Sequence, residues 1–225
     1  MSQTLPSANI YETARQNMVD GQVRTNKVAD QRLLAGLRAL PREEFLPADL
    51  RAKAYIDDDI ILPQGRFLLE PLVLARLIQA LEIAPSDRVL DVGCASGYAA
   101  CLLKMLASEV VACEENPDLA AAAQVNTARF AGAGVMALKA RPNEGFPSQA
   151  PYDAILVEGA CVSVPTPLLD QLAEGGRLTT VIRTGKGLGK AMLYKRQYKN
   201  ISGRVLFDAG VPYLIPPANE DKFVF

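Results

Sequence analysis

The residues of this chain best suited to chemistry lie in a short segment where a buried strand is expected to turn into a helix. Residues 88–97 read RVLDVGCASG, so apolar residues lead into Asp91 and then into a turn that begins at Gly93 and ends at Gly97. Glycines at the carboxyl end of a strand allow the backbone to approach a bound molecule closely. The segment therefore predicts a pocket for a nucleotide-type cofactor.

Two further acids, Glu114 and Glu115, end the next expected strand. A carboxylate at this position can accept hydrogen bonds from both hydroxyls of a ribose. The preceding turn lacks the third glycine of the dinucleotide pattern G-x-G-x-x-G, because the residues between its two glycines are Cys94, Ala95 and Ser96. Acids around the turn would repel a pyrophosphate and attract a sulfonium group, so the pattern favours S-adenosylmethionine over a dinucleotide.

Composition limits the chemistry that such a site could perform. The 225 residues include 24 basic and 25 acidic side chains, with a formal net charge of −1 and no histidine. Without histidine the chain has no Ser/His or Cys/His nucleophile and lacks the usual general base near neutral pH. The balanced charge gives no overall signal for nucleic-acid binding, and we expect no nucleic-acid partner.

The cysteines and the apolar segments bear on metal binding and on location. The four cysteines, at positions 94, 101, 113 and 161, form no C-x-x-C pair, so we expect buried thiols and no metal site. No apolar run approaches the ~20 residues of a membrane-spanning helix, and the first residues lack the features of a secretion signal. We therefore expect a cytoplasmic protein that does not contact a membrane.

The elements that position the glycine turn are expected to form one α/β domain, residues 1–225. Its parts would be an N-terminal helical cap with an acceptor-side segment (residues 1–70), a cofactor-binding core (71–184), and a C-terminal hairpin with a tail (185–225). Apolar strands alternate with amphipathic helices in the core, which predicts a Rossmann-like doubly wound sheet of about seven strands.

Hydrophobic spacing and turn residues predict the individual elements. Asp30 should cap a helix that buries Leu33, Leu34, Leu37 and Leu40, and Pro41 should end it. The other expected helices are residues 11–21, 71–83, 97–106, 118–130 and 167–173. The expected strands are residues 88–92, 109–113, 134–140, 152–157 and 177–183, followed by an antiparallel hairpin of residues 191–196 and 204–208.

Three other segments are expected to have no ligand. Residues 57–59 are three aspartates, but no regular loop of oxygen ligands follows them, and we expect a solvated turn. Residues 185–189, GKGLG, lack the spacing of a phosphate loop and precede a strand, so we expect a plain turn. The terminal Phe-Val-Phe could pack on the sheet edge or on a partner.

Several ordered motifs resemble the protein-L-isoaspartate O-methyltransferase family of class I S-adenosylmethionine-dependent methyltransferases. DVGCASGYAACLL is similar to the first motif of that class. MVDGQVR and RLLAGLRALPREEFLP resemble the leading helices of the family, and APYDAILVEGA and LAEGGRL resemble its later motifs. The resemblance spans roughly residues 15–185. It implies S-adenosylmethionine as the cofactor and a carboxylate of a protein or peptide as the methyl acceptor.

The resemblance also implies roles for individual residues. Asp91 would hold the methionine part of the cofactor together with the turn residues Gly93, Cys94, Ala95, Ser96 and Gly97. Glu114 would hold the ribose, with Glu115 beside it. On the adenine side the family usually has Gly-Asp, whereas this chain has Ala140-Arg141, which makes Arg141 the candidate contact. Glu158 stands where the family tends to have a small neutral or hydroxyl residue.

The acceptor side departs from the family at residues 65–71, GRFLLEP. The family presents Gly-Gln-Thr-Ile-Ser-Gln-Pro there, so Phe67 and Leu69 replace two hydroxyl residues. A leucine side chain cannot form a hydrogen bond with an acceptor. We therefore expect an altered acceptor site with no assigned catalytic residue, whose candidates are Leu69, Glu70 and Asp59. Glu158 could form an acidic wall with Glu70.

Methyl transfer to a carboxylate is compatible with a chain that lacks histidine. The acceptor is already ionised near pH 7, and a sulfonium is a good leaving group, so no base is needed. An amine or hydroxyl acceptor would need Glu70, Glu158 or Asp59 to take its proton. Two other functions remain open: a non-catalytic binding or regulatory protein of the same fold, and an NAD-dependent oxidoreductase, which the missing third glycine disfavours.

Overall fold

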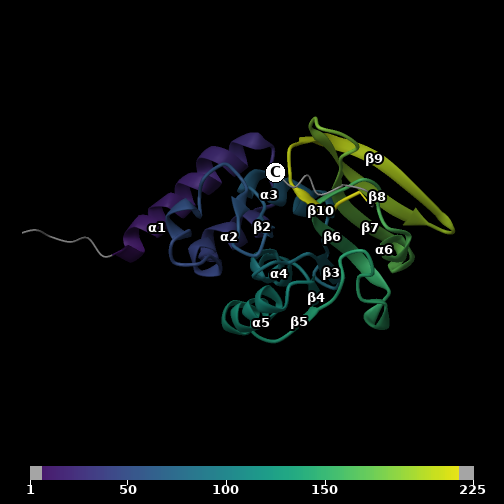
Figure 1. Ribbon diagram of the computed structural model, residues 1–225, viewed down its shortest axis with the longest axis horizontal. Helices are drawn as coiled ribbons and strands as arrows, with labels where there is room; N and C mark the ends of the chain where they lie inside the picture. Colours follow the sequence, from purple (N-terminus) through teal and green to yellow (C-terminus); the bar gives the residue numbers. More distant parts are fainter. Residues whose placement is uncertain (1–6, 218–225) are drawn as a thin grey trace, which may run out of the picture.

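The computed structural model describes residues 7–217, and its main feature is a twisted sheet of eight strands (Figure 1). The strands lie in the order β5 (Val135–Lys139), β4 (Glu109–Glu114), β3 (Arg88–Val92), β6 (Tyr152–Cys161), β7 (Leu172–Ile182), β8 (Gly189–Gln197) and β9 (Asn200–Ala209). The first five run parallel, and β8 and β9 form the expected antiparallel hairpin. A short strand, β10 (Tyr213–Ile215), pairs with the end of β6. The Rossmann-like fold is confirmed.

Some helices cover the sheet, and the amino-terminal helices lie beside it. Their bounds are α1 (Ser7–Asn17), α2 (Gln31–Ala39), α3 (Pro71–Ala80), α4 (Tyr98–Lys104), α5 (Pro117–Phe130) and α6 (Thr166–Asp170). Short helical turns occur at η1 (Met18–Val23), η2 (Arg24–Asn26), η3 (Arg42–Phe45), η4 (Arg51–Lys53) and η5 (Pro147–Gln149). In Figure 1, α1 and α2 lie at the end of the molecule opposite the β8–β9 hairpin. The four leucines predicted to form the buried face of α2 are all buried.

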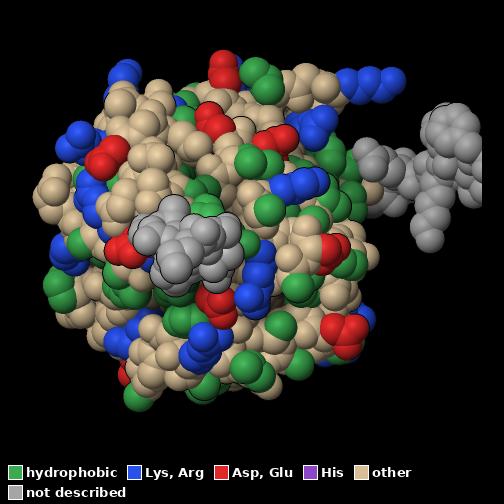
Figure 2. Space-filling model, turned by 90° about the vertical axis from the view of Figure 1, so that its left-hand side faces the viewer, with side chains coloured by type: hydrophobic (Ala, Val, Ile, Leu, Met, Phe, Trp, Pro, Cys, Tyr) green, Lys and Arg blue, Asp and Glu red, His purple; other side chains and the backbone are tan. Residues whose placement is uncertain are grey.

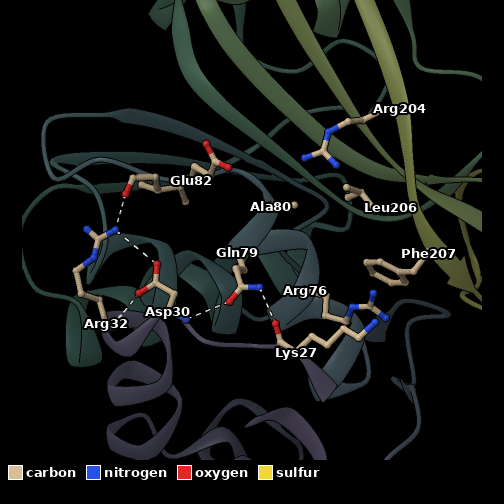
Figure 3. Close-up of a pocket in the computed structure, with 11 residues that line it drawn as sticks. Lys27, Asp30, Arg32, Arg76, Gln79, Ala80, Glu82, Arg204, Leu206 and Phe207 are labelled. Atoms are coloured by element: carbon tan, nitrogen blue, oxygen red, sulfur yellow. Dashed lines mark hydrogen bonds and ion pairs between the residues drawn. The ribbon is translucent and has the colours of Figure 1, made fainter. Parts of the chain in front are cut away.

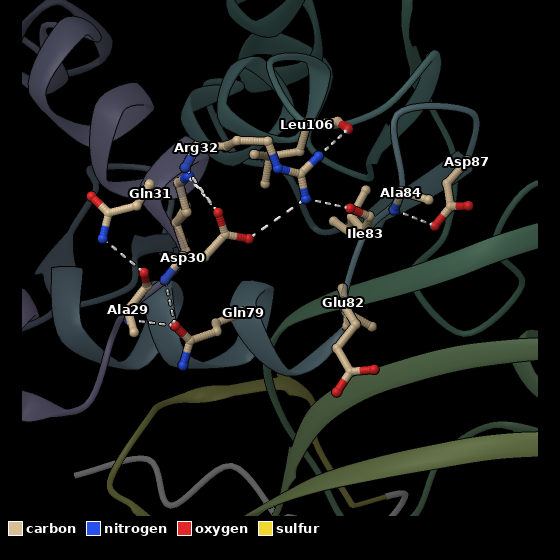
Figure 4. Close-up of polar contacts among 12 residues, drawn as sticks. Ala29, Asp30, Gln31, Arg32, Gln79, Glu82, Ile83, Ala84, Asp87 and Leu106 are labelled. Atoms are coloured by element: carbon tan, nitrogen blue, oxygen red, sulfur yellow. Dashed lines mark hydrogen bonds and ion pairs between the residues drawn. The ribbon is translucent and has the colours of Figure 1, made fainter.

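The start of α2 is held by the side chain of Asp30, as expected. Its Oδ1 accepts hydrogen bonds from the backbone N–H groups of Arg32 at 2.9 Å and Leu33 at 3.2 Å. The backbone N–H groups of Ala29 and Asp30 in turn donate to Oε1 of Gln79 on α3, at 2.6 and 3.0 Å (Figure 4). The cap therefore also ties α2 to the helix that precedes β3.

The variant Asp30→Ala is expected to lower the free energy of unfolding by about 1 kcal/mol, because two backbone donors lose their acceptor. This corresponds to a decrease in Tm of about 2–4 °C for a chain of this size. Urea unfolding measures the change. Asp30→Asn retains an acceptor oxygen and should lose clearly less stability; an equal loss in both variants would show that the cap does not stabilise α2.

Several element boundaries differ from the prediction: the first helix is α1 at Ser7–Asn17 rather than 11–21, β6 extends to Cys161 rather than 157, and the largest difference lies between α6 and β7. The expected helix of residues 167–173 is limited to α6, and β7 begins at Leu172 rather than at 177. The backbone N–H of Tyr152 donates to the carbonyl of Gln171 at 2.8 Å, so pairing with the start of β6 ends the helix. The sequence favoured a longer helix, because Leu168, Leu169 and Leu172 also have helical spacing. As expected, residues 185–188 lie in the short connection that joins β7 to β8.

A two-stranded sheet, which the sequence analysis did not predict, lies between the helical cap and α3. Strand β1 (Ile60–Ile61) pairs antiparallel with β2 (Phe67–Leu68), and the N–H of Leu62 donates to the carbonyl of Arg66 at 2.8 Å. Strands of two residues are too short to show an alternating pattern in a sequence. This β1–β2 hairpin brings Arg66 to the carboxyl ends of the central strands.

The remaining general expectations concern thiols, membranes and surface charge. All four cysteines are buried and form no disulfide, as expected. None of the helices between residues 7 and 217 is long and apolar enough to cross a membrane. On the face that Figure 2 shows, basic and acidic side chains are interspersed. The terminal Phe-Val-Phe lies outside the described residues.

Candidate functional site

Three carboxylates lie close together at the carboxyl ends of three neighbouring strands. In the sheet register, Asp91 of β3 is opposite Ala112 of β4 and Leu156 of β6. Side chains alternate between the faces of a strand, so Glu114 and Glu158, each two residues further on, share the face of Asp91. All three acids are buried. The sequence placed Asp91 and Glu114 around the same turn and suggested Glu70 as the neighbour of Glu158, whereas the sheet register places Glu158 beside Asp91 and Glu114.

Asp91 and Glu158 are neighbouring buried acids, and burial favours the protonated form of each. Within the described part of the chain, three of their carboxyl oxygens have no hydrogen-bond partner: both oxygens of Asp91 and Oε1 of Glu158. Burial raises the pKa of Asp91 to about 7; contact with the Glu158 carboxyl opposes this rise, and the charge of Glu114 adds to it. Burial and the neighbouring Asp91 raise the pKa of Glu158 well above its usual range.

Glu114, the acid expected to hold a ribose, already has several donors. The backbone N–H groups of Ala95 and Asn116 each donate to its carboxylate at 2.9 Å. The Nε of Arg66 lies 3.2 Å from both carboxylate oxygens, and Nη2 of the same side chain donates to the carbonyl of Gly93 at 2.9 Å. Arg66 therefore links the predicted ribose acid to the glycine turn.

The turn itself has the backbone geometry that its glycines imply. Gly93 and Gly97 have φ values of +83° and +90°, in the region that favours glycine. A Cβ at Gly97 would also lie 3.2 Å from Cα of Ala123 on α5. The hydroxyl of Ser96 donates to the carbonyl of Phe45 at 2.7 Å, so this side chain connects the turn to the helical cap. Cys94 is buried, and burial raises the pKa of its thiol.

Two of the candidate residues lie towards solvent. Glu115 is exposed beside Pro142. Arg141 has a side chain that is 69% exposed, and its Nη1 lies 3.3 Å from Oε1 of Glu144. The described contacts of Arg141 are thus with its own loop rather than with Glu114, and its contact with adenine stays a prediction.

The acceptor-side candidates form a separate cluster. Leu69 is buried, and its carbonyl accepts a hydrogen bond from Nη2 of Arg42 at 2.7 Å. Oδ1 of Asp59 accepts one from the backbone N–H of Glu70 at 2.8 Å. Burial raises the pKa of Asp59 to about 6 and that of Glu70 to about 7, where neighbouring aspartates add to the effect. The charges acting on Glu70 come from residues 57–59 rather than from Glu158.

The cavity beside the predicted cofactor residues is small, and a much larger groove lies away from them. The cavity between Arg66, Glu114 and Leu214 has a volume of about 30 Å³. A groove of about 630 Å³ lies elsewhere, where the start of α2, the end of α3 and strand β9 meet, and Arg76 stacks on Phe207 there (Figure 3). None of the predicted site residues lines this groove. Among residues 7–217 no group of three His, Cys, Asp or Glu side chains could hold a metal ion.

The parallel sheet, with a glycine turn after β3 and an acid at the end of β4, defines the fold of class I S-adenosylmethionine-dependent methyltransferases. A solved protein-L-isoaspartate O-methyltransferase matches with a TM-score of 0.78 at 22% identity, over 88% of this chain and 65% of that chain. A Plasmodium falciparum structure of the same family name, in complex with S-adenosyl-L-homocysteine, matches with a TM-score of 0.72 at 20% identity, over 91% and 97% of the two chains.

Sequence comparison identifies the family. The profile of Protein-L-isoaspartate(D-aspartate) O-methyltransferase matches residues 13–213. The protein-L-isoaspartate O-methyltransferase of Methanoculleus marisnigri is 39% identical over 183 residues, which cover 81% of this chain and 83% of that protein. The Koribacter versatilis protein of the same name is 37% identical, over 77% and 78% of the two chains. This chain belongs to the protein-L-isoaspartate O-methyltransferase family, which rules out the NAD-dependent oxidoreductase.

The site residues can be compared with the needs of S-adenosylmethionine, the cofactor of this family. The polar groups suit it, because Glu114 lies at the end of β4 and the glycine turn follows β3. The space beside Glu114 does not, since about 30 Å³ is far below the roughly 300–1,000 Å³ of small-molecule sites, and the cavity of about 270 Å³ that Ser96 lines is on the side of the helical cap and α5. A Cβ on Gly93 would lie 2.6 Å from Leu214 and 2.8 Å from Arg66, the two side chains that fill the site.

Proposed function

We propose that this chain is an S-adenosylmethionine-dependent methyltransferase that acts on a carboxylate of a protein or peptide, and that its acceptor differs from isoaspartate. The observation that carries this proposal is the acceptor segment. Phe67 and Leu69 replace the two hydroxyl residues of the family motif, and both side chains are buried in the core. The segment therefore offers neither side-chain hydroxyl to an acceptor.

This type of transfer needs no side chain that the chain lacks. When bound, S-adenosylmethionine supplies a methyl group on a sulfonium that leaves readily. Phe67 and Leu69 give the acceptor segment buried apolar side chains in place of hydroxyls. The Leu69 carbonyl is held by Arg42, so the segment has a defined position. A carboxylate acceptor is ionised at neutral pH and needs no base, which is consistent with a chain without histidine.

The variant Phe67→Thr/Leu69→Ser, which restores the hydroxyls of the family motif, tests the proposal. We expect the wild-type chain to transfer labelled methyl groups to an isoaspartyl peptide about tenfold more slowly than the double variant, the equivalent of one hydrogen bond. Release of labelled methanol from the ester at alkaline pH measures the rate. The matched control is Ile61→Thr, which adds a hydroxyl at an exposed position of the same β1–β2 hairpin.

The outcomes of this experiment separate the possible acceptors. Equal and rapid transfer to the isoaspartyl peptide by the wild-type chain and the double variant would contradict an altered acceptor site. Transfer by the wild-type chain to unfractionated protein, but not to the isoaspartyl peptide, would support it. A melting curve for each variant shows whether the hydroxyls disturb the buried segment.

A second candidate function is supported by a different observation. Because Arg66 bonds to Glu114 and to the glycine turn, the chain could also serve as a non-catalytic binding or regulatory protein of this family. Such a protein would transfer no methyl group to any acceptor. Turnover with any protein acceptor would therefore exclude this candidate.

A further inference from the structure

We infer that Arg66 closes the cofactor site of this protein, so that S-adenosylmethionine and Arg66 compete for the same groups and Arg66 sets the cofactor affinity. The inference rests on the proposed function only in assigning this site to S-adenosylmethionine. It concerns binding, and it holds whether or not a methyl group is then transferred.

The contacts of Arg66 show that its position is specific. The guanidinium bonds to both oxygens of Glu114 through Nε and to the carbonyl of Gly93 through Nη2. The side chain is only 14% exposed, and that of Glu114 only 1%. A hydrogen bond between two charged groups is stronger than a neutral one, and burial shields this pair from water. A ribose could reach Glu114 only if this bond were broken.

The charges around the site explain why an arginine is stable there. Glu114, Asp91 and Glu158 place three buried acids on one face of the sheet, and the positive charge of Arg66 favours the ionised form of Glu158. An acidic pocket of this kind also attracts a sulfonium. Arg66 therefore pairs Glu114 with a cation that belongs to the chain, in the place where the cofactor would bring its own.

The elements that carry the two blocking side chains are small. Arg66 follows the turn of the β1–β2 hairpin, in which a Cβ on Gly65 would meet no atom within 4 Å. Leu214, the other blocking residue, lies on β10, a strand of three residues. Because Phe67 is in the core and β10 pairs with β6, the simplest opening is a movement of the Arg66 side chain alone, which leaves the central strands in place.

The direct test is isothermal titration of S-adenosylhomocysteine, which is not consumed, into the wild-type chain and the variant Arg66→Gln. Glutamine is the residue at this position of the family motif. We expect Arg66→Gln to bind S-adenosylhomocysteine with a Kd at least about tenfold lower than that of the wild type. This factor is the equivalent of one charge-assisted hydrogen bond. Arg38→Gln is the matched control, because it removes an arginine paired with Asp20 at 2.8 Å on the helical cap, and its Kd should equal that of the wild type.

Two further variants test the same inference if Arg66→Gln does not fold. Arg66→Lys keeps a cation but only one point of contact, and we expect an intermediate Kd. Leu214→Ala enlarges the site without changing its charge and should also lower the Kd. Equal Kd values for the wild-type chain, Arg66→Gln and Leu214→Ala, or binding by the wild type alone, would overturn the inference. Tighter binding by Arg66→Gln without any methyl transfer would support it while contradicting the proposed function.

Discussion

The variant Arg42→Ala is expected to lower the free energy of unfolding by about 3–5 kcal/mol, the range for loss of a large buried side chain together with its hydrogen bonds. Arg42 has no exposed surface. Its Nε donates to the carbonyl of Ala54 at 2.8 Å, and its Nη2 donates to that of Leu69 at 2.7 Å. The guanidinium also lies 4.8 Å from the ring centroid of Tyr98. Alanine would leave two buried carbonyls without donors and a cavity beside the ring.

Thermal unfolding and urea titration both measure this effect. At about 2–4 °C for each kcal/mol, Arg42→Ala should melt roughly 6–20 °C below the wild type. Arg42→Lys retains one donor group and should fall in between. The control is Arg141→Ala, whose exposed pair with Glu144 should contribute less than about 1 kcal/mol. If Arg42→Ala were as stable as this control, the two buried carbonyls would not depend on Arg42.

Loss of Arg42 should also affect the acceptor side. The bond to the Leu69 carbonyl holds the segment that leads into Glu70 and α3. Without it, Leu69 would be free to leave the core, and the position of the acceptor segment would no longer be defined. A partly stable Arg42→Lys chain should therefore lose methyl transfer more than it loses cofactor binding, since the cofactor groups lie on other strands.

The second large effect is a change in the pH dependence of stability in Asp91→Asn. In the unfolded chain Asp91 ionises near pH 4, whereas in the folded chain it keeps its proton up to about pH 7 because it is buried. Between these values the folded state binds more protons, so the free energy of unfolding falls as the pH rises. Asp91→Asn removes this ionising group, so the variant should be more stable than the wild type above about pH 7.

Melting curves of the cofactor-free chain at pH 4.5, 6 and 8 test this prediction. Asp91→Asn should have a higher Tm than the wild type at pH 8, and the difference should shrink towards pH 4.5. Asp49→Asn, at an exposed position, should follow the wild type at every pH. A Tm difference that is independent of pH would show that Asp91 is not buried as a proton-binding acid. A buried acid that lowers stability at neutral pH is typical of a functional site.

Much of the core could be predicted because its signals are local. Strand β3 has the bounds that the sequence predicted, residues 88–92, and β4 extends the prediction by one residue. Runs of apolar residues between turn signals are sufficient to identify such buried parallel strands. The boundary between α6 and β7 was wrong, because leucines at helical spacing also suit a strand, and pairing with β6 decided between them.

The sequence by itself determined the family, the parallel sheet, the glycine turn, and the acids at the ends of β3 and β4. It also identified the loss of two hydroxyls in the acceptor segment. These properties depend on residue types and on spacing within single elements. The tertiary structure decided which of the candidates meet: Asp91, Glu114 and Glu158 share a face because three strands align in register. It also decided that Arg66 lies against Glu114, 48 residues further along the chain, because hairpin packing rather than spacing brings them together.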